Sequence, residues 1–213
     1  MSVDSKKELL VRSLYFLMGV CICAFGAAMF VLCDTGTDPF GMLMQGIART
    51  FGLSNGIAHI SINAVLILVI LAIDRSYIRI GTFISLVGMG TVIDLASRLL
   101  RGIIHSGLPF WLRFFLMLLA CIILSLGLDC IISAQIGTGA NDLVAVIISD
   151  KAHWQFRWVR IAVDVTWVLS GLLLGGVAGV GTIAAALIIG PIAQFFMPPI
   201  RMLLQTFLNN TEQ

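Results

Sequence analysis

Two polar turns, each followed by a short apolar stretch, contain residue types that could bind a ligand inside a membrane. The first reads Asp34-Thr35-Gly36-Thr37-Asp38-Pro39-Phe40-Gly41. The second reads Gln135-Ile136-Gly137-Thr138-Gly139-Ala140-Asn141-Asp142. Glycine permits unusual backbone angles, proline suits the first turn of a helix, and Asp38 is expected to act as N-cap. A short helix that starts at membrane depth would point free N–H groups at a cavity, where they favour an anionic group.

Three carboxylates lie within long apolar stretches, at Asp94, Asp129 and Asp164. Insertion of a carboxylate into a bilayer costs roughly 2.5–3.5 kcal/mol, so such groups usually face a cavity or a charged partner. They could bind a cation or an amine, or take up a proton. Asp164 follows Arg160 by four residues and Asp94 precedes Arg98 by four, so structural ion pairs along one helix face are the alternative.

The composition excludes several classes of protein. Of the 213 residues, 59% are hydrophobic and 11% are charged, and the mean hydropathy is +1.05. Soluble domains carry about 25% charged residues, so a soluble enzyme and a disordered chain are both excluded. A net charge of +2 offers no basic surface for nucleic acid. The chain is therefore predicted to be an all-α polytopic protein of the lipid bilayer.

Six apolar segments are long enough to cross a hydrocarbon core of about 30 Å, and two others are too short to do so. The six expected spans are about 9–33, 56–74, 79–100, 110–134, 157–176 and 180–204. The two short segments are about 39–51 and 140–151. Each short segment is either a broken or re-entrant helix inside the membrane or a capped helix lying flat at its surface.

Most of the 13 Lys and Arg residues fall on one side if the N-terminus is inside. This bias predicts a bacterial cytoplasmic (inner) membrane protein with both termini in the cytoplasm. The five cysteines lie in apolar stretches without a C-x-x-C pair, so they are interpreted as packing residues rather than a disulfide framework.

The chain contains an internal repeat. A shift of 101 residues aligns Gly36-Thr37 with Gly137-Thr138 and Arg12 with Arg113. Three spans in each half would make the second half insert upside down, which predicts two inverted three-helix repeats, each with a short helix. We expect the first repeat at 1–105 and the second at 106–213, within one integrated membrane domain.

Polar residues recur at matched positions in the two halves, as Asn63 with Asp164 and, after a one-residue slip in the last span, Asp94 with Gln194. Asp129 matches the apolar Ala28 and is therefore a weaker candidate. The matched residues and the two turns predict a substrate site between the halves. The expected substrate-binding residues are Asp38, Asn63, Asp94, Asn141, Asp142, Asp164 and Gln194. The expected backbone turns are Gly36, Thr37, Gly137, Thr138 and Gly139.

We therefore expect a secondary transporter of a small polar or zwitterionic solute, with a carboxylate as a carrier of protons. The alternative is a membrane partner without transport activity, such as a substrate-capture subunit or a regulatory protein. No metal-binding or nucleophile-plus-base motif is present, so neither an enzyme, a cofactor nor a metal is expected. Gly171 and Gly175 form a small-x-x-x-small motif, which predicts either a homodimer contact or internal packing.

The two turns resemble a pattern in the YczE/YyaS/YitT-type family of bacterial membrane proteins, where a Gly-x-Gly-Pro-x-Asp element follows the first helix and recurs in the second half. The second copy here keeps Gly137, Gly139 and Asp142, with Ala140 in place of proline. The first copy has Asp38 for the second glycine and Gly41 for the aspartate, so only Asp142 inherits the aspartate position. The resemblance covers most of the chain, and it implies the architecture more than an activity, because the family is largely of unassigned molecular function.

Overall fold

The computed structural model describes residues 3–53, 55–105 and 107–211 of the chain. Within these ranges the structure does not describe the side chains of residues 3–6, 55–56, 59–60, 86–87, 94 and 210–211. All regular structure in the described ranges is helical, which confirms the all-α class.

The described chain contains eight α-helices and one 3-10 turn. They are α1 (Val3–Leu32), α2 (Pro39–Phe51), α3 (Asn55–Asp74), η1 (Arg75–Tyr77), α4 (Ile80–Leu100), α5 (Phe110–Ala134), α6 (Ala140–Ala152), α7 (Phe156–Leu173) and α8 (Val180–Thr211). The predicted segments match these helices, and α2 and α6 are the two short ones. The bounds of α6 differ from those of α2 by 101 residues at both ends.

Four of the described helices are long and apolar enough to cross a membrane. The segments are Lys7–Leu32 of α1, Ile80–Leu100 of α4, Phe110–Ala134 of α5 and Val180–Asn209 of α8. The other two predicted spans correspond to α3 and α7, which have 20 and 18 residues. Helix α7 contains Arg157, Arg160 and Asp164, and these charges lower its mean hydropathy.

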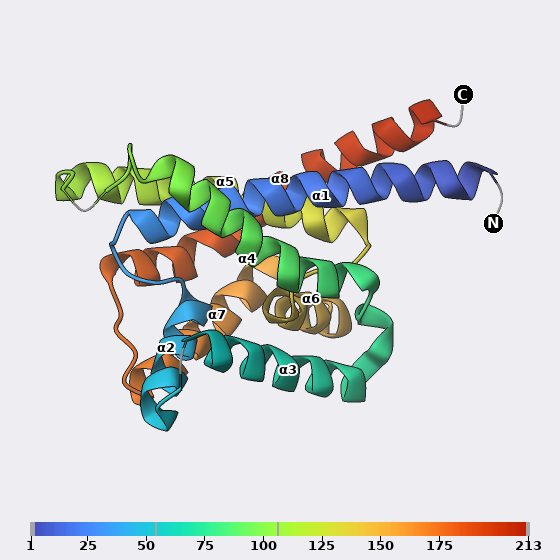
Figure 1. Ribbon diagram of the computed structural model, residues 1–213. Helices are drawn as coiled ribbons and strands as arrows, with labels where there is room; N and C mark the ends of the chain where they lie inside the picture. The colour runs from blue at the N-terminus through green and yellow to red at the C-terminus, as the bar shows by residue number, and fades with distance from the viewer. Residues whose placement is uncertain (1–2, 54, 106, 212–213) are drawn as a thin grey trace.

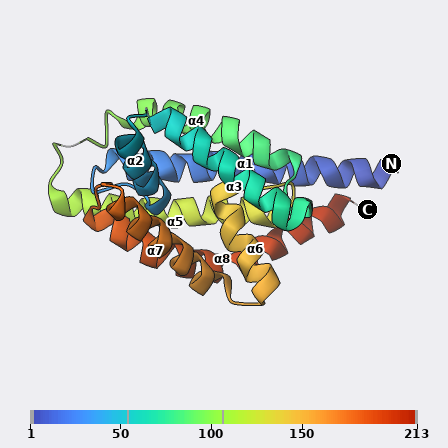
Figure 2. The same cartoon turned by 90° about the horizontal axis from the view of Figure 1, so that it is seen from below.

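The long helices form one layer, and the shorter helices α2, α3, α6 and α7 lie on one side of it (Figures 1 and 2). Helix α1 packs against α4, α5 and α8. Helix α1 begins and α8 ends at the same end of the molecule, as both views show. This placement is what an even number of membrane crossings requires.

Helices α1 and α5 run antiparallel and touch through glycine on both sides. A Cβ atom added at Gly26 would lie 2.6 Å from the backbone nitrogen of Leu124, and one added at Gly127 would overlap the backbone nitrogen of Cys23. Because only glycine lacks this atom, the two backbones can approach this closely. A shift of 101 residues converts the first contact into the second.

Backbone contacts at the starts of α4 and α8 also match between the halves, with a one-residue slip that pairs Gly81 with Gly181. The N–H of Gly81, at the start of α4, donates to the carbonyl of Ile136 at 3.1 Å. The N–H of Gly181, at the start of α8, donates to the carbonyl of Thr35 at 3.0 Å. The turns thus pack against the starts of α4 and α8, and each half supplies the turn for the other half's last helix.

The two turns also share their backbone conformation. Gly36 has φ 138° and Gly137 has φ 142°, while Asp34 and Gln135 are left-handed at 48° and 57°. A residue with a Cβ is strained at the two glycine positions, which explains why both turns contain Gly-Thr.

The short helices contact the opposite half differently. Helix α2 meets α7 through two glycines, and a Cβ added at Gly46 would lie 2.8 Å from the carbonyl oxygen of Gly171. Helix α6 meets α3 through larger side chains, because Ile147 packs with Ile70 in one buried cluster. The residues of this second contact occupy the positions that match Gly46 and Gly171 by the 101-residue shift.

Candidate functional site

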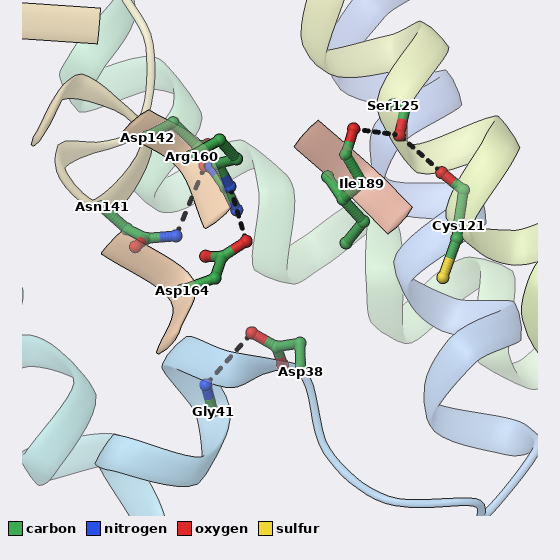
Figure 3. Close-up of polar contacts among 9 residues, drawn as sticks. All are labelled: Asp38, Gly41, Cys121, Ser125, Asn141, Asp142, Arg160, Asp164 and Ile189. Carbon is green, nitrogen blue, oxygen red and sulfur yellow. Dashed lines mark hydrogen bonds and ion pairs between the residues drawn. The ribbon is translucent and has the colours of Figure 1, made fainter. Parts of the chain in front are cut away.

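A buried guanidinium, Arg160, bridges two carboxylates (Figure 3). Its Nη1 lies 2.6 Å from Oδ1 of Asp142, and its Nε lies 2.9 Å from Oδ2 of Asp164. Arg160 is 5% exposed and Asp164 is 0% exposed. The expected helix-face pair of Arg160 and Asp164 is therefore present, and the structure adds Asp142 to it.

Three helices fix this group. Asp142 lies in the first turn of α6, while Arg160 and Asp164 lie one turn apart on α7. Behind them, Gly190 of α8 allows close approach, because a Cβ added there would be 3.2 Å from the Cβ of Arg160. The Asn141 amide nitrogen donates to Asp142 at 3.3 Å. Asn141 and Asp142, the two substrate-binding residues predicted in the second turn, therefore both belong to the group.

Asp38, from the first half of the chain, lies near the same guanidinium. Its Oδ2 accepts a hydrogen bond from the N–H of Gly41 at 3.1 Å, which confirms Asp38 as the N-cap of α2. Burial raises the pKa of Asp38 above its ordinary value; Asp142 also raises it, while the Gly41 bond and the nearby Arg160 oppose the rise. Figure 3 shows Asp38 at the start of α2 and Asp164 beside Arg160 on α7, and the two carboxylates are close enough to interact electrostatically.

Two oxygen atoms of this group are buried without a hydrogen-bond partner among the described residues. They are Oδ1 of Asp164 and Oδ1 of Asn141. A buried acceptor that lacks a donor costs about 1–3 kcal/mol. These atoms are therefore places where a ligand N–H or a proton would stabilise the protein.

The other predicted site residues lie elsewhere or remain undescribed. Asn63 is buried in α3. Gln194 lies in α8 and its Oε1 accepts from the backbone N–H of Arg157 at 3.4 Å, one turn before Arg160. Asp94 lies in α4, and its side chain is outside the described part of the chain.

The turn residues serve mainly to join the halves. The Thr182 hydroxyl donates to the carbonyl of Thr37 at 2.5 Å, and a Cβ added at Gly137 would lie 2.5 Å from the nitrogen of Thr82. Thr138 is buried and its hydroxyl has no partner among the described residues. Gly139 is the N-cap of α6 and provides no side-chain acceptor.

The short helices are packed inside the bundle. Helix α2 contacts α3 and α7, and helix α6 contacts the same two helices. Buried residues of α2 include Phe40 and Met42, and those of α6 include Leu143 and Ile147. This packing favours helices enclosed by protein over helices lying flat on a bilayer.

Two other predicted features have clear positions. Gly171 packs against the backbone of Met42 and Leu43, which agrees with internal packing, while Gly175 is exposed and a homodimer contact there stays a prediction. Asp129 is 0% exposed in α5, and neither of its oxygens has a described partner. Sequence analysis treats Asp129 as a weaker candidate for the substrate site than Asp94 and Asp164, because the residue that matches it, Ala28, is apolar.

The pH dependence of stability tests the environment of Asp38. An acid whose pKa is raised in the folded state stabilises the protein below its unfolded pKa, and this contribution is lost as pH rises through the folded pKa. We expect the thermal midpoint in detergent to fall over that interval, and Asp38→Asn, which keeps the capping oxygen, to flatten the fall. An identical pH profile for the variant would contradict a raised pKa of Asp38.

The chain is similar to several known proteins. It is 27% identical over 195 residues to the "Uncharacterized membrane protein YczE" of Bacillus subtilis (strain 168), covering 91% of this chain and 88% of the relative. It is 26% identical over 181 residues to an "Uncharacterized protein" of Haemophilus influenzae, covering 85% and 81%. It is 22% identical over 193 residues to YyaS of B. subtilis, covering 88% and 93%.

No solved structure matches the chain. These relatives support a membrane protein and agree with the family that the two turns resemble. One family profile matches residues 10–198, which is most of the chain. The chain therefore belongs to this family, described as a family of unknown function (DUF6198).

Proposed function

We propose that this protein is a secondary transporter of a small polar or zwitterionic solute, bound between two inverted halves and coupled to a proton. In this proposal α3 and α7 complete six crossings. The protein acts as a carrier rather than as an enzyme, and it lies in the bacterial cytoplasmic membrane.

The matched contacts support the inverted arrangement. Helices α1 and α5 are equivalent under the 101-residue shift and run antiparallel, which supports opposite orientations of the two halves. Arg12 donates to the carbonyl of Ala134 at 3.4 Å, and Arg113 donates to the carbonyl of Cys33 at 3.3 Å. Both residues of the first contact are shifted by 101 residues relative to those of the second.

The observation that carries the proposal is the buried charge group around Arg160. Three carboxylates, Asp38, Asp142 and Asp164, accompany one guanidinium. Asp38 comes from the first half and the others from the second half. Asp164 is buried, and Asp38 and Asp142 are half-buried. Such acids in excess of their partners favour a bound cation or proton, and a site shared by both halves would change shape when the halves move.

The unsatisfied atoms favour an amine-bearing solute. Oδ1 of Asp164 and Oδ1 of Asn141 can accept N–H donors. The first turn of α6 has no side-chain cap, so its N–H groups can bind an anionic group. A small zwitterion meets both requirements, and ionisation of Asp38 would couple its binding to pH.

The positions of the first and last helices agree with the proposed topology. The start of α1 and the end of α8 lie at the same end of the long-helix layer, and Arg12, Arg79 and Arg201 line a cavity at that end. By the positive-inside rule this side is the cytoplasm.

The first test is a thermal-stability screen of purified protein in detergent with amino acids, amines and other small polar solutes at several pH values. A solute at about 100 times its Kd should stabilise by roughly 2.7 kcal/mol. We then expect flux of the hit into proteoliposomes, and at least a tenfold loss in Asp142→Asn and in Asp164→Asn, which remove the charge but keep the size.

Asp34→Asn is the matched control, because the side chain of Asp34 is exposed and pairs with Arg113 rather than with Arg160. It should leave both binding and flux unchanged. Normal flux in both site variants would refute the site. Binding without flux by the purified chain would refute transport and favour the alternative of a substrate-capture partner.

A further inference from the structure

A cavity of about 630 Å³ opens at the end of the molecule where α1 begins and α8 ends. Its polar lining includes Arg12, Arg79, Arg201, Ser133, Thr138 and Asp150. We call it the arginine cavity. Asp38, Asp142 and Asp164 are not among its lining residues, so it is distinct from the Arg160 group.

The arginine cavity has an excess of positive charge. Arg79 donates to the carbonyl of Gln135 and has no carboxylate partner among the described residues. Arg201 makes neither a hydrogen bond nor a salt bridge with a described residue, and its electrostatic partner is the buried carboxylate of Asp129, which does not line the cavity. Arg12 pairs with Glu8 at 2.8 Å outside the cavity. In the lining, three guanidiniums face the single described carboxylate of Asp150.

Two buried hydroxyls in the lining also lack partners. Ser133 is 7% exposed and Thr138 is 4% exposed, and neither hydroxyl has a hydrogen-bond partner among the described residues. A hydroxyl buried beside guanidiniums that lack carboxylates can donate to an anionic oxygen. The cavity thus combines charge with unsatisfied donors.

The matching position at the opposite end shows that this charge is a property of one end only. There Arg113 lies 3.6 Å from the carboxylate of Asp34. At the arginine cavity the position equivalent to Asp34 is Gln135, a neutral residue. The acid equivalent to Asp34 is therefore absent at this end, and Arg12 pairs instead with Glu8, which does not line the cavity.

We propose that the arginine cavity binds a phosphate group. Guanidinium is the side-chain group best suited to phosphate oxygens, through charge and paired N–H donors. The phosphate can belong to an anionic lipid headgroup or to a free solute. Leu204 and Leu208 also line the cavity, and they provide apolar surface beside the charges.

The test measures thermal unfolding of the purified full chain in neutral detergent. One series adds inorganic phosphate, with chloride at equal ionic strength as its reference. A second series adds phosphatidylglycerol, with phosphatidylcholine as its reference. We expect saturable stabilisation in at least one series, and at least a tenfold higher half-saturation concentration in Arg201→Gln.

Arg101→Gln is the matched control, since Arg101, the C-cap residue of α4, matches Arg201 after a one-residue slip in the repeat and does not line the cavity. It should behave as the wild type. Arg79 donates a hydrogen bond to the backbone carbonyl of Gln135, so its replacement would also disturb the turn. Arg201 makes no such bond with a described residue, so Arg201→Gln changes the charge of the cavity without disturbing the turn.

The two series distinguish the sources of the phosphate. Stabilisation by phosphatidylglycerol alone would identify a lipid headgroup, and stabilisation by inorganic phosphate as well would identify a site open to free solutes. The proposal is overturned if neither probe stabilises the protein, or if Arg201→Gln and Arg101→Gln respond alike. These outcomes do not depend on whether the chain transports a solute at Arg160.

Discussion

Replacing Gly127 by leucine is expected to prevent the stable packing of α1 against α5. A Cβ at this position would overlap the backbone of Cys23, which cannot move aside as a flexible side chain can. Overpacking in a well-filled core typically costs 1–3 kcal/mol. A clash with backbone belongs at or above the upper end, so we expect a loss of about 3 kcal/mol or more and little monodisperse protein.

Reactivity of the buried thiols can measure this loss. Cys23, Cys33, Cys121 and Cys130 are free and buried, so a thiol-reactive dye reports their exposure during a thermal ramp in detergent. Gly127→Ala should lower the midpoint less than Gly127→Leu does. Gly90→Ala is the control, because a Cβ at Gly90 meets nothing within 4 Å. A wild-type midpoint for Gly127→Leu would contradict the close helix contact.

The second large effect is expected from Arg160→Met. This change keeps an apolar stem but leaves Asp142 and Asp164 without their shared cation. Removing one partner of a buried ion pair typically costs about 3–5 kcal/mol, because the remaining charge is uncompensated. We expect a marked fall in the thermal midpoint and loss of solute binding.

A compensated variant separates charge imbalance from lost packing. In Arg160→Met combined with Asp142→Asn and Asp164→Asn, no ionised group of the trio remains. Its stability should recover most of the loss, since buried ion pairs can often be replaced by neutral residues at little cost. Solute binding should stay absent. If the compensated variant is as unstable as Arg160→Met, packing of the side chain rather than its charge is what matters.

The helices could be predicted from the sequence because hydropathy and length decide them. The α2 and α6 segments were identifiable since each is too short to cross a bilayer and follows a Gly-Thr turn. Whether these helices lie inside the protein or at a membrane surface could not be predicted from the sequence. Burial of Met42 and Leu143 depends on neighbours far away in the chain.

The candidate site was predictable only in part. The four-residue spacing of Arg160 and Asp164 is a local signal, and it correctly indicated their pair. The bond between Arg160 and Asp142 joins different helices 18 residues apart, which no helical period encodes. The approach of Asp38 to Arg160 requires the two halves to pack together, and the 101-residue repeat predicted the halves but not this contact.

Matched polar positions were a weaker guide. Gln194 was chosen because it matches Asp94, yet it binds the backbone of Arg157 one turn from the charge group. Arg160 itself was overlooked as a site residue because it was interpreted as the structural partner of Asp164. A more useful signal was the sequence distance between Asp142, in the first turn of a short helix, and the Arg160–Asp164 pair on the next helix.

The unequal contacts of the short helices have a thermodynamic consequence for the proposed transport cycle. Two halves with identical contacts could exchange conformations without a change in free energy, so both conformers would be equally populated. Here Gly46 and Gly171 form one interface, whereas Ile70 and Ile147 form its counterpart. The exchange is therefore not degenerate, and each 1.4 kcal/mol of difference favours one conformer about tenfold. The resting direction of the carrier would be encoded in these four residues rather than imposed by the solute.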